Sequence, residues 1–164
     1  MTSKNATRLA LAAVGATVLA GCLDSNPIAP VYQCQVRAQP SVAVAGDTVR
    51  ETNGLKYINM EVGDTSSRGT NVTASSAVDV CYVGFFPNGQ VFDPGGQPLS
   101  FTPNANRVIP GFAQGVVGMR SGSTRRIIVP PALGYGSQPV ERNGTVVIPA
   151  NSTLVFDVGV LRIR

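Results

Sequence analysis

The chain of 164 residues contains no histidine and no tryptophan, and only 13% of its residues are charged. Histidine is the side chain most often used as a general base near neutral pH, and it is the commonest protein ligand of metal ions. Its absence argues against a catalytic triad and against a zinc site. We therefore expect no metal ion and no cofactor, and a function that depends little on proton transfer.

Basic residues are also too few and too scattered for a nucleic-acid-binding surface. The formal net charge is +4, but only two residues are lysine and no basic run is longer than Arg125-Arg126. Proteins that track a phosphate backbone carry clustered Lys and Arg side chains. We therefore expect no nucleic-acid partner.

The N-terminus has the organisation of a secretory signal. Residues 1–8 carry two basic and no acidic residues, and an apolar run follows over 9–20. That run is too short to stay in a bilayer as a transmembrane helix, whereas a basic start before a short apolar run is typical of a signal peptide. The tetrapeptide Leu-Ala-Gly-Cys at 19–22 is similar to the bacterial lipoprotein box, which implies cleavage before Cys22 and acylation of its thiol. The alternative is an ordinary signal peptide with a coincidental cysteine.

This interpretation divides the chain into three parts. Residues 1–21 are the signal peptide, residues 22–50 are a tether and N-terminal extension, and residues 51–164 are the folded domain. Removal of the signal peptide leaves 11 basic and 9 acidic residues, a net charge near +2. We expect an extracytoplasmic protein that a lipid anchor holds on a bacterial membrane. If the cell has two membranes, Leu23 favours the outer one, because it is not the Asp that retains lipoproteins at the inner membrane.

The three cysteines divide into one lipid site and one pair. If lipid occupies Cys22, then Cys34 and Cys81 remain as an even pair in an oxidising compartment. Cys81 lies in an alternating segment and points away from the core if Val80 and Tyr82 face the core. A segment that precedes the domain could present Cys34 to that outer face. We predict a Cys34–Cys81 disulfide, with two free thiols as the alternative.

The folded domain shows the alternation of an antiparallel sheet and one helical segment. Strand patterns bounded by Gly, Pro and Asn turn signals occur over 55–62, 77–86, 91–93, 99–101, 124–129 and 153–163. Pro110 suits the first turn of a helix. Phe112, Val116 and Met119 then fall on one face of that helix. We predict an α+β fold, an antiparallel half-open roll of five or six strands wrapped on one short helix.

Three segments concentrate apolar and aromatic residues among Gly and Pro, with hardly an ionisable side chain. They are residues 108–112, 129–136 and 154–158. This combination suits a dry, preformed pocket for an apolar group. Each aromatic residue, taken singly, is better explained as part of the core.

In order and spacing, these segments resemble the FKBP-type peptidyl-prolyl cis–trans isomerases, which bind tacrolimus and rapamycin. The resemblance covers about residues 51–164. Cys-Tyr-Val-Gly at 81–84 with Asn-Gly-Gln-Val-Phe-Asp at 88–93 resembles the family's strand–turn–strand. Val-Ile-Pro-Gly-Phe at 108–112 resembles the segment that lines the pocket, and Leu-Gly-Tyr-Gly at 133–136 resembles the Tyr-x-Tyr-Gly turn.

The resemblance implies a set of site residues. The implied catalytic residues are Tyr82, Phe92, Asp93, Phe112, Tyr135 and Phe156. The implied substrate-binding residues are Leu99, Phe101, Val108, Ile109, Leu133 and Ile148. In the family, the Ile backbone N–H and the Tyr hydroxyl of the turn bind the ligand, roles that fall here to Ile109 and Tyr135.

This sequence departs from the family pattern at several positions. Leu99, Phe112 and Leu133 stand where the family has Phe, often Trp, and Tyr. The loop over 93–98 is shorter than usual and lacks the Arg that pairs with the pocket Asp, which leaves the partner of Asp93 open. These changes bear on substrate and drug affinity more than on the fold.

The resemblance implies a prolyl isomerase that assists the folding of exported proteins by binding proline-containing polypeptides, and that macrolides of the tacrolimus or rapamycin type inhibit. Rotation about an X–Pro bond needs no nucleophile, because its barrier comes from amide resonance. A pocket that excludes water and grips the proline ring can bind the twisted amide better than the planar one. One alternative is a non-catalytic peptide-binding or chaperone module on the same fold. Another is a structural envelope lipoprotein, a role that does not require an aromatic pocket.

Overall fold

The computed structural model describes residue 34 and residues 49–50, 53–61, 63 and 70–164. These residues all belong to one compact unit, Tyr32–Arg164. The expected signal peptide, the lipidation site Cys22 and nearly all of the N-terminal extension lie outside the described residues.

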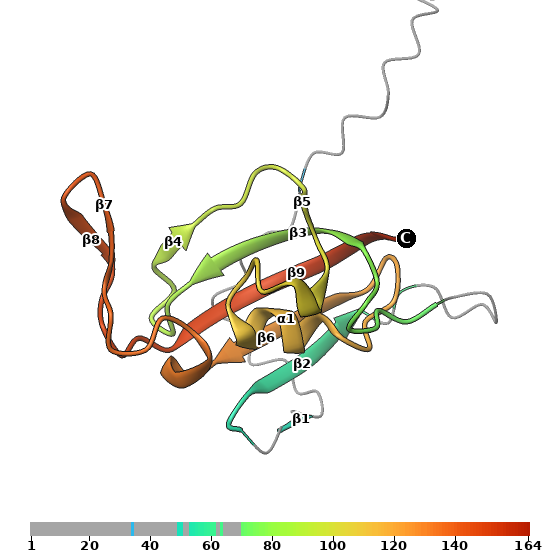
Figure 1. The fold of residues 1–164 in the computed structure, drawn as a ribbon, viewed down its shortest axis with the longest axis horizontal. Coiled ribbons are helices and arrows are strands. Elements are labelled where there is room, and N and C mark those ends of the chain that lie inside the picture. The colour runs from blue at the N-terminus through green and yellow to red at the C-terminus, as the bar shows by residue number, and fades with distance from the viewer. Residues whose placement is uncertain (1–33, 35–48, 51–52, 62, 64–69) are drawn as a thin grey trace, which may run out of the picture. The chain divides into compact units, whose positions relative to one another are not determined.

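One antiparallel sheet forms the frame of the domain (Figure 1). Its strands are β1 (Val49–Arg50), β2 (Lys56–Glu61), β3 (Val78–Phe85), β4 (Val91–Asp93), β5 (Leu99–Phe101), β6 (Thr124–Val129) and β9 (Leu154–Ile163). The spatial order is β1-β2-β6-β9-β3-β4, and β5 also pairs with β3. The long strands β3 and β9 pair at the centre of the sheet.

Strands β4 and β5 together occupy one position at the edge of the sheet. Both pair with β3, β4 near its end and β5 near its start. The loop over 94–98, which contains two prolines and two glycines, separates them. The prediction of a five- or six-stranded antiparallel roll with one short helix is therefore confirmed.

Helix α1 (Pro110–Val116) lies against one face of the sheet (Figure 1). It begins at Pro110, whose missing N–H costs nothing in the first turn of a helix. Two glycines on its inner face allow it to approach β6 closely. A Cβ at Gly111 would lie 2.4 Å from Val129 Cγ1, and one at Gly115 would lie 2.5 Å from Ile127 Cγ2.

The C-terminal end of α1 is held by a buried arginine. The Arg125 guanidinium donates to the carbonyl oxygens of Gly115 at 2.7 Å and Val117 at 3.1 Å. A cation there satisfies carbonyls that have no partner within the helix and complements the helix dipole. The same guanidinium stacks over the Tyr57 ring at 4.0 Å. Arg125 is thus a structural residue and not part of a basic surface.

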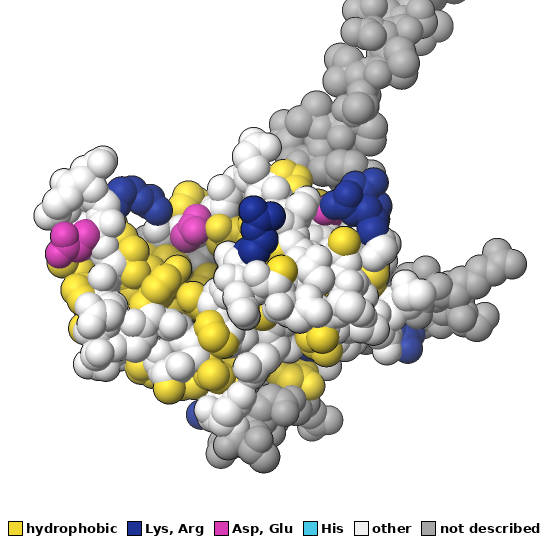
Figure 2. Space-filling model, viewed as in Figure 1, with side chains coloured by type: hydrophobic (Ala, Val, Ile, Leu, Met, Phe, Trp, Pro, Cys, Tyr) yellow, Lys and Arg dark blue, Asp and Glu magenta, His cyan; other side chains and the backbone are white. Residues whose placement is uncertain are grey.

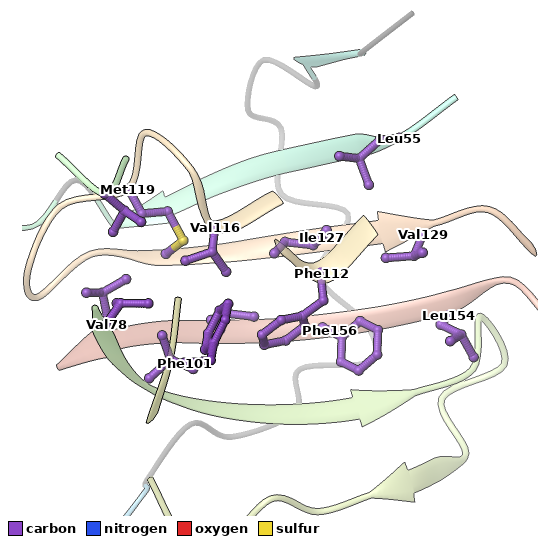
Figure 3. Packing of buried hydrophobic residues seen from close by; sticks show 14 of the residues in the cluster. Leu55, Val78, Phe101, Phe112, Val116, Met119, Ile127, Val129, Leu154 and Phe156 are labelled. Atoms are coloured by element: carbon purple, nitrogen blue, oxygen red, sulfur yellow. The ribbon is translucent and has the colours of Figure 1, made fainter. Parts of the chain in front are cut away.

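The main core fills the space between α1 and the sheet (Figure 3). Phe112, Val116 and Met119, which were expected on one helix face, are all buried. Met119 lies just beyond the end of the helix, because the chain turns at Gly118 with φ +80°. The core residues labelled in Figure 3 are Leu55, Val78, Phe101, Phe112, Val116, Met119, Ile127, Val129, Leu154 and Phe156.

The opposite face of the sheet carries a smaller apolar cluster and two cross-links. Val83, Phe85 and Val155 are buried there. Arg126 and Asp157, directly opposite each other on β6 and β9, form a buried two-pronged ion pair at 2.7 and 2.8 Å.

The second cross-link on this face is a disulfide. Cys34 is bonded to Cys81, and their Cα atoms lie 5.2 Å apart. Since Cys81 alternates with the core residues Val80 and Tyr82 along β3, its side chain leaves the sheet on the outer face. The bond therefore ties residue 34 to the centre of the sheet.

A separate hairpin, β7 (Val140–Arg142) and β8 (Thr145–Ile148), projects from the domain (Figure 1). The strand patterns in the sequence, which end at residue 129 and resume at 153, did not predict it. Asn143 and Gly144 have φ values of +53° and +75°, the backbone of a tight two-residue hairpin turn. Two short 3-10 helices, Pro103–Ala105 and Pro131–Leu133, were also not predicted.

Candidate active site

A pocket of about 230 Å³ opens beside the N-terminal end of α1. It is lined by Tyr82, Phe92, Asp93, Leu99, Arg107, Val108, Ile109, Phe112, Tyr135 and Phe156. Nine of these ten were proposed from the sequence. Residues from β3, β4, β5, α1, β9 and two connecting loops therefore converge on one pocket.

Four aromatic rings in mutual edge contact form the wall of the pocket. Phe156 lies at the centre, with its ring centroid 5.1 Å from Phe112, 5.7 Å from Phe92 and 6.3 Å from Tyr82. Tyr82 and Phe112 are 5.6 Å apart. Edge-to-face rings at these distances stabilise one another, so the wall is preformed.

Gly84 makes room for two of these rings. It pairs with Phe156 across β3 and β9 and with Asp93 across β3 and β4. A Cβ at this position would lie 2.7 Å from the Phe92 ring and 3.1 Å from the Phe156 ring. The absence of a side chain on β3 thus lets the rings from β4 and β9 meet.

Asp93 is bound by two donors from the protein. The Tyr82 hydroxyl donates to Oδ2 at 2.8 Å, and the Gly95 backbone N–H donates to Oδ1 at 3.0 Å. Gly95 has φ +66°, and a Cβ there would lie 2.1 Å from the Tyr82 carbonyl oxygen. The partners that the sequence left open are therefore Tyr82 and the glycine of the short loop.

Both tyrosines of the pocket keep their protons at neutral pH. Burial raises the pKa of Tyr82 to about 12, and the hydrogen bond to Asp93 adds to this effect. Burial, with a smaller contribution from the Asp93 charge, also raises the pKa of Tyr135. Both hydroxyl groups are therefore hydrogen-bond donors, and neither is a base.

Two donors at the pocket have no partner among the described residues. The hydrogen bonds formed by this part of the chain do not use the Ile109 N–H, which directly precedes α1. They do not use the Tyr135 hydroxyl either, and Tyr135 is 41% exposed. The pocket thus combines an apolar wall with two hydrogen-bond donors for a ligand.

Three residues expected at the pocket do not line it. Phe101 is 5% exposed and packs beneath Phe112, with ring centroids 5.6 Å apart, because it lies one step deeper than Leu99 on the same face of β5. Ile148 is buried in the core at the end of β8. Leu133 packs against the core and faces Gly111 at the start of α1.

Arg107 is the lining residue that the sequence analysis missed. It lies directly before the Val-Ile-Pro-Gly segment, and that position was the only signal that could have identified it. The described residues contain no group of three or more His, Cys, Asp or Glu side chains able to hold a metal ion. In the described part of the chain, no helix has the length and apolar character needed to cross a membrane.

Comparison with known proteins identifies the family. The sequence profile of the FKBP-type peptidyl-prolyl cis-trans isomerases matches residues 68–161. The chain belongs to this family. The chain is 35% identical to FK506-binding protein 4 of Gibberella zeae over 144 residues, which is 87% of this chain and 27% of that protein. It is 42% identical to FK506-binding protein 3 of Candida albicans over 58% of this chain and 22% of that protein.

The FKBP domain is also similar to solved structures. The crystal structure of FkpA from Escherichia coli shows 35% identity and a TM-score of 0.59, over 71% of this chain and 51% of that chain. AtFKBP13 shows 29% identity and a TM-score of 0.63, over 72% of this chain and 99% of that chain. The chain spans about a quarter of the length of the curated relatives named above.

Proposed function

We propose that this FKBP domain catalyses the cis–trans isomerisation of X–Pro bonds in polypeptides. The observation that carries the proposal is the aromatic pocket with two unused donors, the Ile109 N–H and the Tyr135 hydroxyl, at its edge. The rings of Phe112 and Phe156 offer an apolar contact surface to the proline ring.

The pocket acts on the substrate by shape and desolvation. The barrier of about 18–20 kcal/mol reflects the loss of amide resonance as the bond twists. The twisted amide is less polar than the planar one, so an apolar pocket that excludes water favours it. The Ile109 N–H and Tyr135 hydroxyl hold carbonyl groups of the substrate chain while the bond rotates. No proton is transferred in this scheme.

Macrolides of the tacrolimus and rapamycin type are proposed ligands of the same pocket. Support comes from the pocket chemistry and from fungal relatives that are named FK506-binding proteins. Such a ligand would occupy the proline site and compete with the peptide. Inhibition would therefore be competitive.

Acceleration of cis-to-trans relaxation in short X–Pro peptides, and its loss on addition of rapamycin, tests the proposal. The competing function is a non-catalytic peptide-binding module. The observation that favours it is Leu99, which lines the pocket at a position where the resemblance implies a Phe. Suppressed aggregation of an unfolded protein without any acceleration of peptide relaxation would support that alternative.

We further propose that the mature protein is a lipoprotein on the outside of a bacterial membrane, where it acts on exported polypeptides. The support is the basic start, the apolar run and the Leu-Ala-Gly-Cys sequence that ends at Cys22. Two or three acyl chains hold a protein on a membrane stably, whereas a single chain does so only marginally. The variant Cys22→Ser should leave the membrane fraction, and unchanged partition would refute the anchor.

A further inference from the structure

Arg107 brings a positive charge to a pocket that is otherwise largely apolar. It is exposed, and it is the one basic residue among those that line the pocket. Within the described part of the chain, no hydrogen bond or ion pair engages its guanidinium group. By contrast, the arginines at positions 126 and 162 are paired with Asp157 and Asp79.

The carboxylate of the pocket, Asp93, keeps its negative charge but forms no ion pair with Arg107 among the described residues. Both oxygens of Asp93 accept hydrogen bonds from other groups, Tyr82 on one and Gly95 on the other. Arg107 lies only two residues before Ile109, whose N–H is free to hold the substrate backbone. A guanidinium group is therefore placed beside the path of a bound polypeptide.

A second arginine adds to the positive potential. Burial and the Asp93 carboxylate raise the pKa of Tyr82, whereas the Arg142 guanidinium on hairpin β7–β8 lowers this pKa. The charge of Arg142 therefore acts on the pocket. Figure 2 shows basic side chains beside an area of hydrophobic side chains on this face, together with acidic side chains at its border. These two guanidinium groups attract an anionic group on a bound peptide, and the Asp93 carboxylate opposes this attraction.

We infer that the site prefers polypeptides with a carboxylate side chain next to the proline, and that Arg107 is the residue that pairs with this carboxylate. The inference rests on the proposed function and specifies its substrate class. Because the pair would be exposed to solvent, the preference should be modest, about two- to fivefold in kcat/KM. It should also weaken as salt screens the charges.

Matched peptides X–Pro–Y with Glu or Gln at X, or with Glu or Gln at Y, isolate the charge from the size of the side chain. With the full chain at low ionic strength, we expect a Glu-to-Gln ratio of about two to five in kcat/KM at one of the two positions. The Arg107→Gln variant should bring this ratio to about 1. The Arg107→Glu variant should bring the Glu-to-Gln ratio below 1, and it should act faster on a matched peptide with Lys than on the one with Gln.

Arg164→Gln is the matched control, because it removes the same charge at the opposite end of β9 and should retain the wild-type ratio. Two outcomes overturn the inference while the proposed function stands. In the first, all peptides are accelerated and the Glu and Gln peptides react at equal rates. In the second, the Glu-to-Gln ratio in kcat/KM is unchanged in Arg107→Gln. If no peptide is accelerated, the proposed function fails. Binding affinities for the same Glu and Gln peptides, from titrations followed by NMR, then decide the charge preference on their own.

Discussion

The hydroxyl groups of Tyr82 and Tyr135 have different roles in the pocket. The Tyr82 hydroxyl is committed to Asp93 at 2.8 Å and therefore fixes the wall. The Tyr135 hydroxyl has no partner in the described part of the chain and lies partly exposed at the pocket edge. The first residue is thus expected to position the site, and the second to contact the ligand.

Removal of the Tyr135 hydroxyl should weaken macrolide binding with little change in the fold. We expect Tyr135→Phe to lose about 0.5–1.5 kcal/mol of binding free energy, the contribution of one neutral hydrogen bond. Calorimetric titration with rapamycin measures the loss. Tyr57→Phe, whose ring lies on β2 against Arg125 outside the pocket, is the control. Full affinity in Tyr135→Phe would show that this hydroxyl does not face the ligand.

The raised pKa of Tyr82 predicts a loss of stability in alkaline solution. The tyrosine loses its proton near pH 10 in the unfolded chain and near pH 12 in the folded one. Between these values the unfolded state is favoured by deprotonation, so the stabilisation present below pH 10 disappears as the pH rises. Urea midpoints should fall more steeply from pH 9 to 11.5 in the wild type than in Tyr82→Phe. Parallel pH dependence in the two proteins would contradict this assignment.

Much of the pocket could be predicted because the order and spacing of its segments resemble those of the FKBP family, whereas no aromatic residue taken singly identifies a pocket. Phe101 shows where this reasoning ends. It shares a face of β5 with Leu99, as a pocket residue should, but it lies further into the core and packs under Phe112. Arg107 was not predicted, because a charged residue next to an apolar segment is usually exposed to solvent and has no role in a pocket.

At the scale of elements, the close packing of α1 on β6 determines where the pocket lies. The helix presents Phe112 to the pocket and follows directly from Ile109. Gly111 and Gly115 let the helix lie close enough for this, since an added Cβ at either position would overlap a side chain of β6. Close packing of this kind leaves little room for even one methyl group.

The contact between Gly111 and Val129 should appear as an energetic coupling. Gly111→Ala alone should destabilise the domain by about 1–3 kcal/mol through overpacking. Val129→Ala removes the overlapping methyl groups. The loss of unfolding free energy in the double variant should therefore be smaller than the sum of the two single losses, by roughly 0.5–3 kcal/mol. Urea denaturation of the four proteins measures this coupling.

Gly115→Ala combined with Val129→Ala is the matched control for that cycle. A Cβ at Gly115 would meet Ile127 and not Val129, so the two losses should simply add. Additive losses in the Gly111 cycle as well would show that the helix shifts to accommodate the methyl group. The close packing of α1 on β6 would then not be a requirement of the fold.

The elements differ in how far their sequences specify them. Alternation and turn residues predicted β3, β4, β5 and β6 almost to the residue, because each has one face on the core. The hairpin β7–β8 escaped, although Asn143-Gly144 is a strong turn signal, because its strands are short and mostly exposed. Such strands lack the alternation that burial imposes.

At the scale of the whole molecule, the Cys34–Cys81 bond joins the N-terminal extension to the sheet across a sequence separation of 47 residues. A cross-link that closes a loop of this length stabilises the folded state by about 4 kcal/mol in the chain-entropy account. Reduction should lower the free energy of unfolding by up to that amount. Mass spectrometry of the alkylated, non-reduced protein provides the direct check. Two alkylatable thiols besides Cys22 would refute the pairing.

Catalysis by the aromatic pocket is the central claim, and a pair of identical substitutions tests it most directly. Phe156 and Phe85 are 5% and 3% exposed, but Phe156 lines the pocket while Phe85 lies in the cluster on the opposite face of the sheet. Replacement of either ring by Leu removes similar packing from the fold. Only the first substitution removes a ring from the site.

The measurement is kcat/KM for cis-to-trans isomerisation of an X–Pro peptide by the wild type, Phe156→Leu and Phe85→Leu, with urea midpoints for all three. We predict clear acceleration by the wild type, a loss of about tenfold or more in Phe156→Leu, equivalent to about 1.4 kcal/mol of transition-state stabilisation, and a much smaller loss in Phe85→Leu at comparable stability. Equal losses in the two variants, or no acceleration by the wild-type protein, would contradict the account.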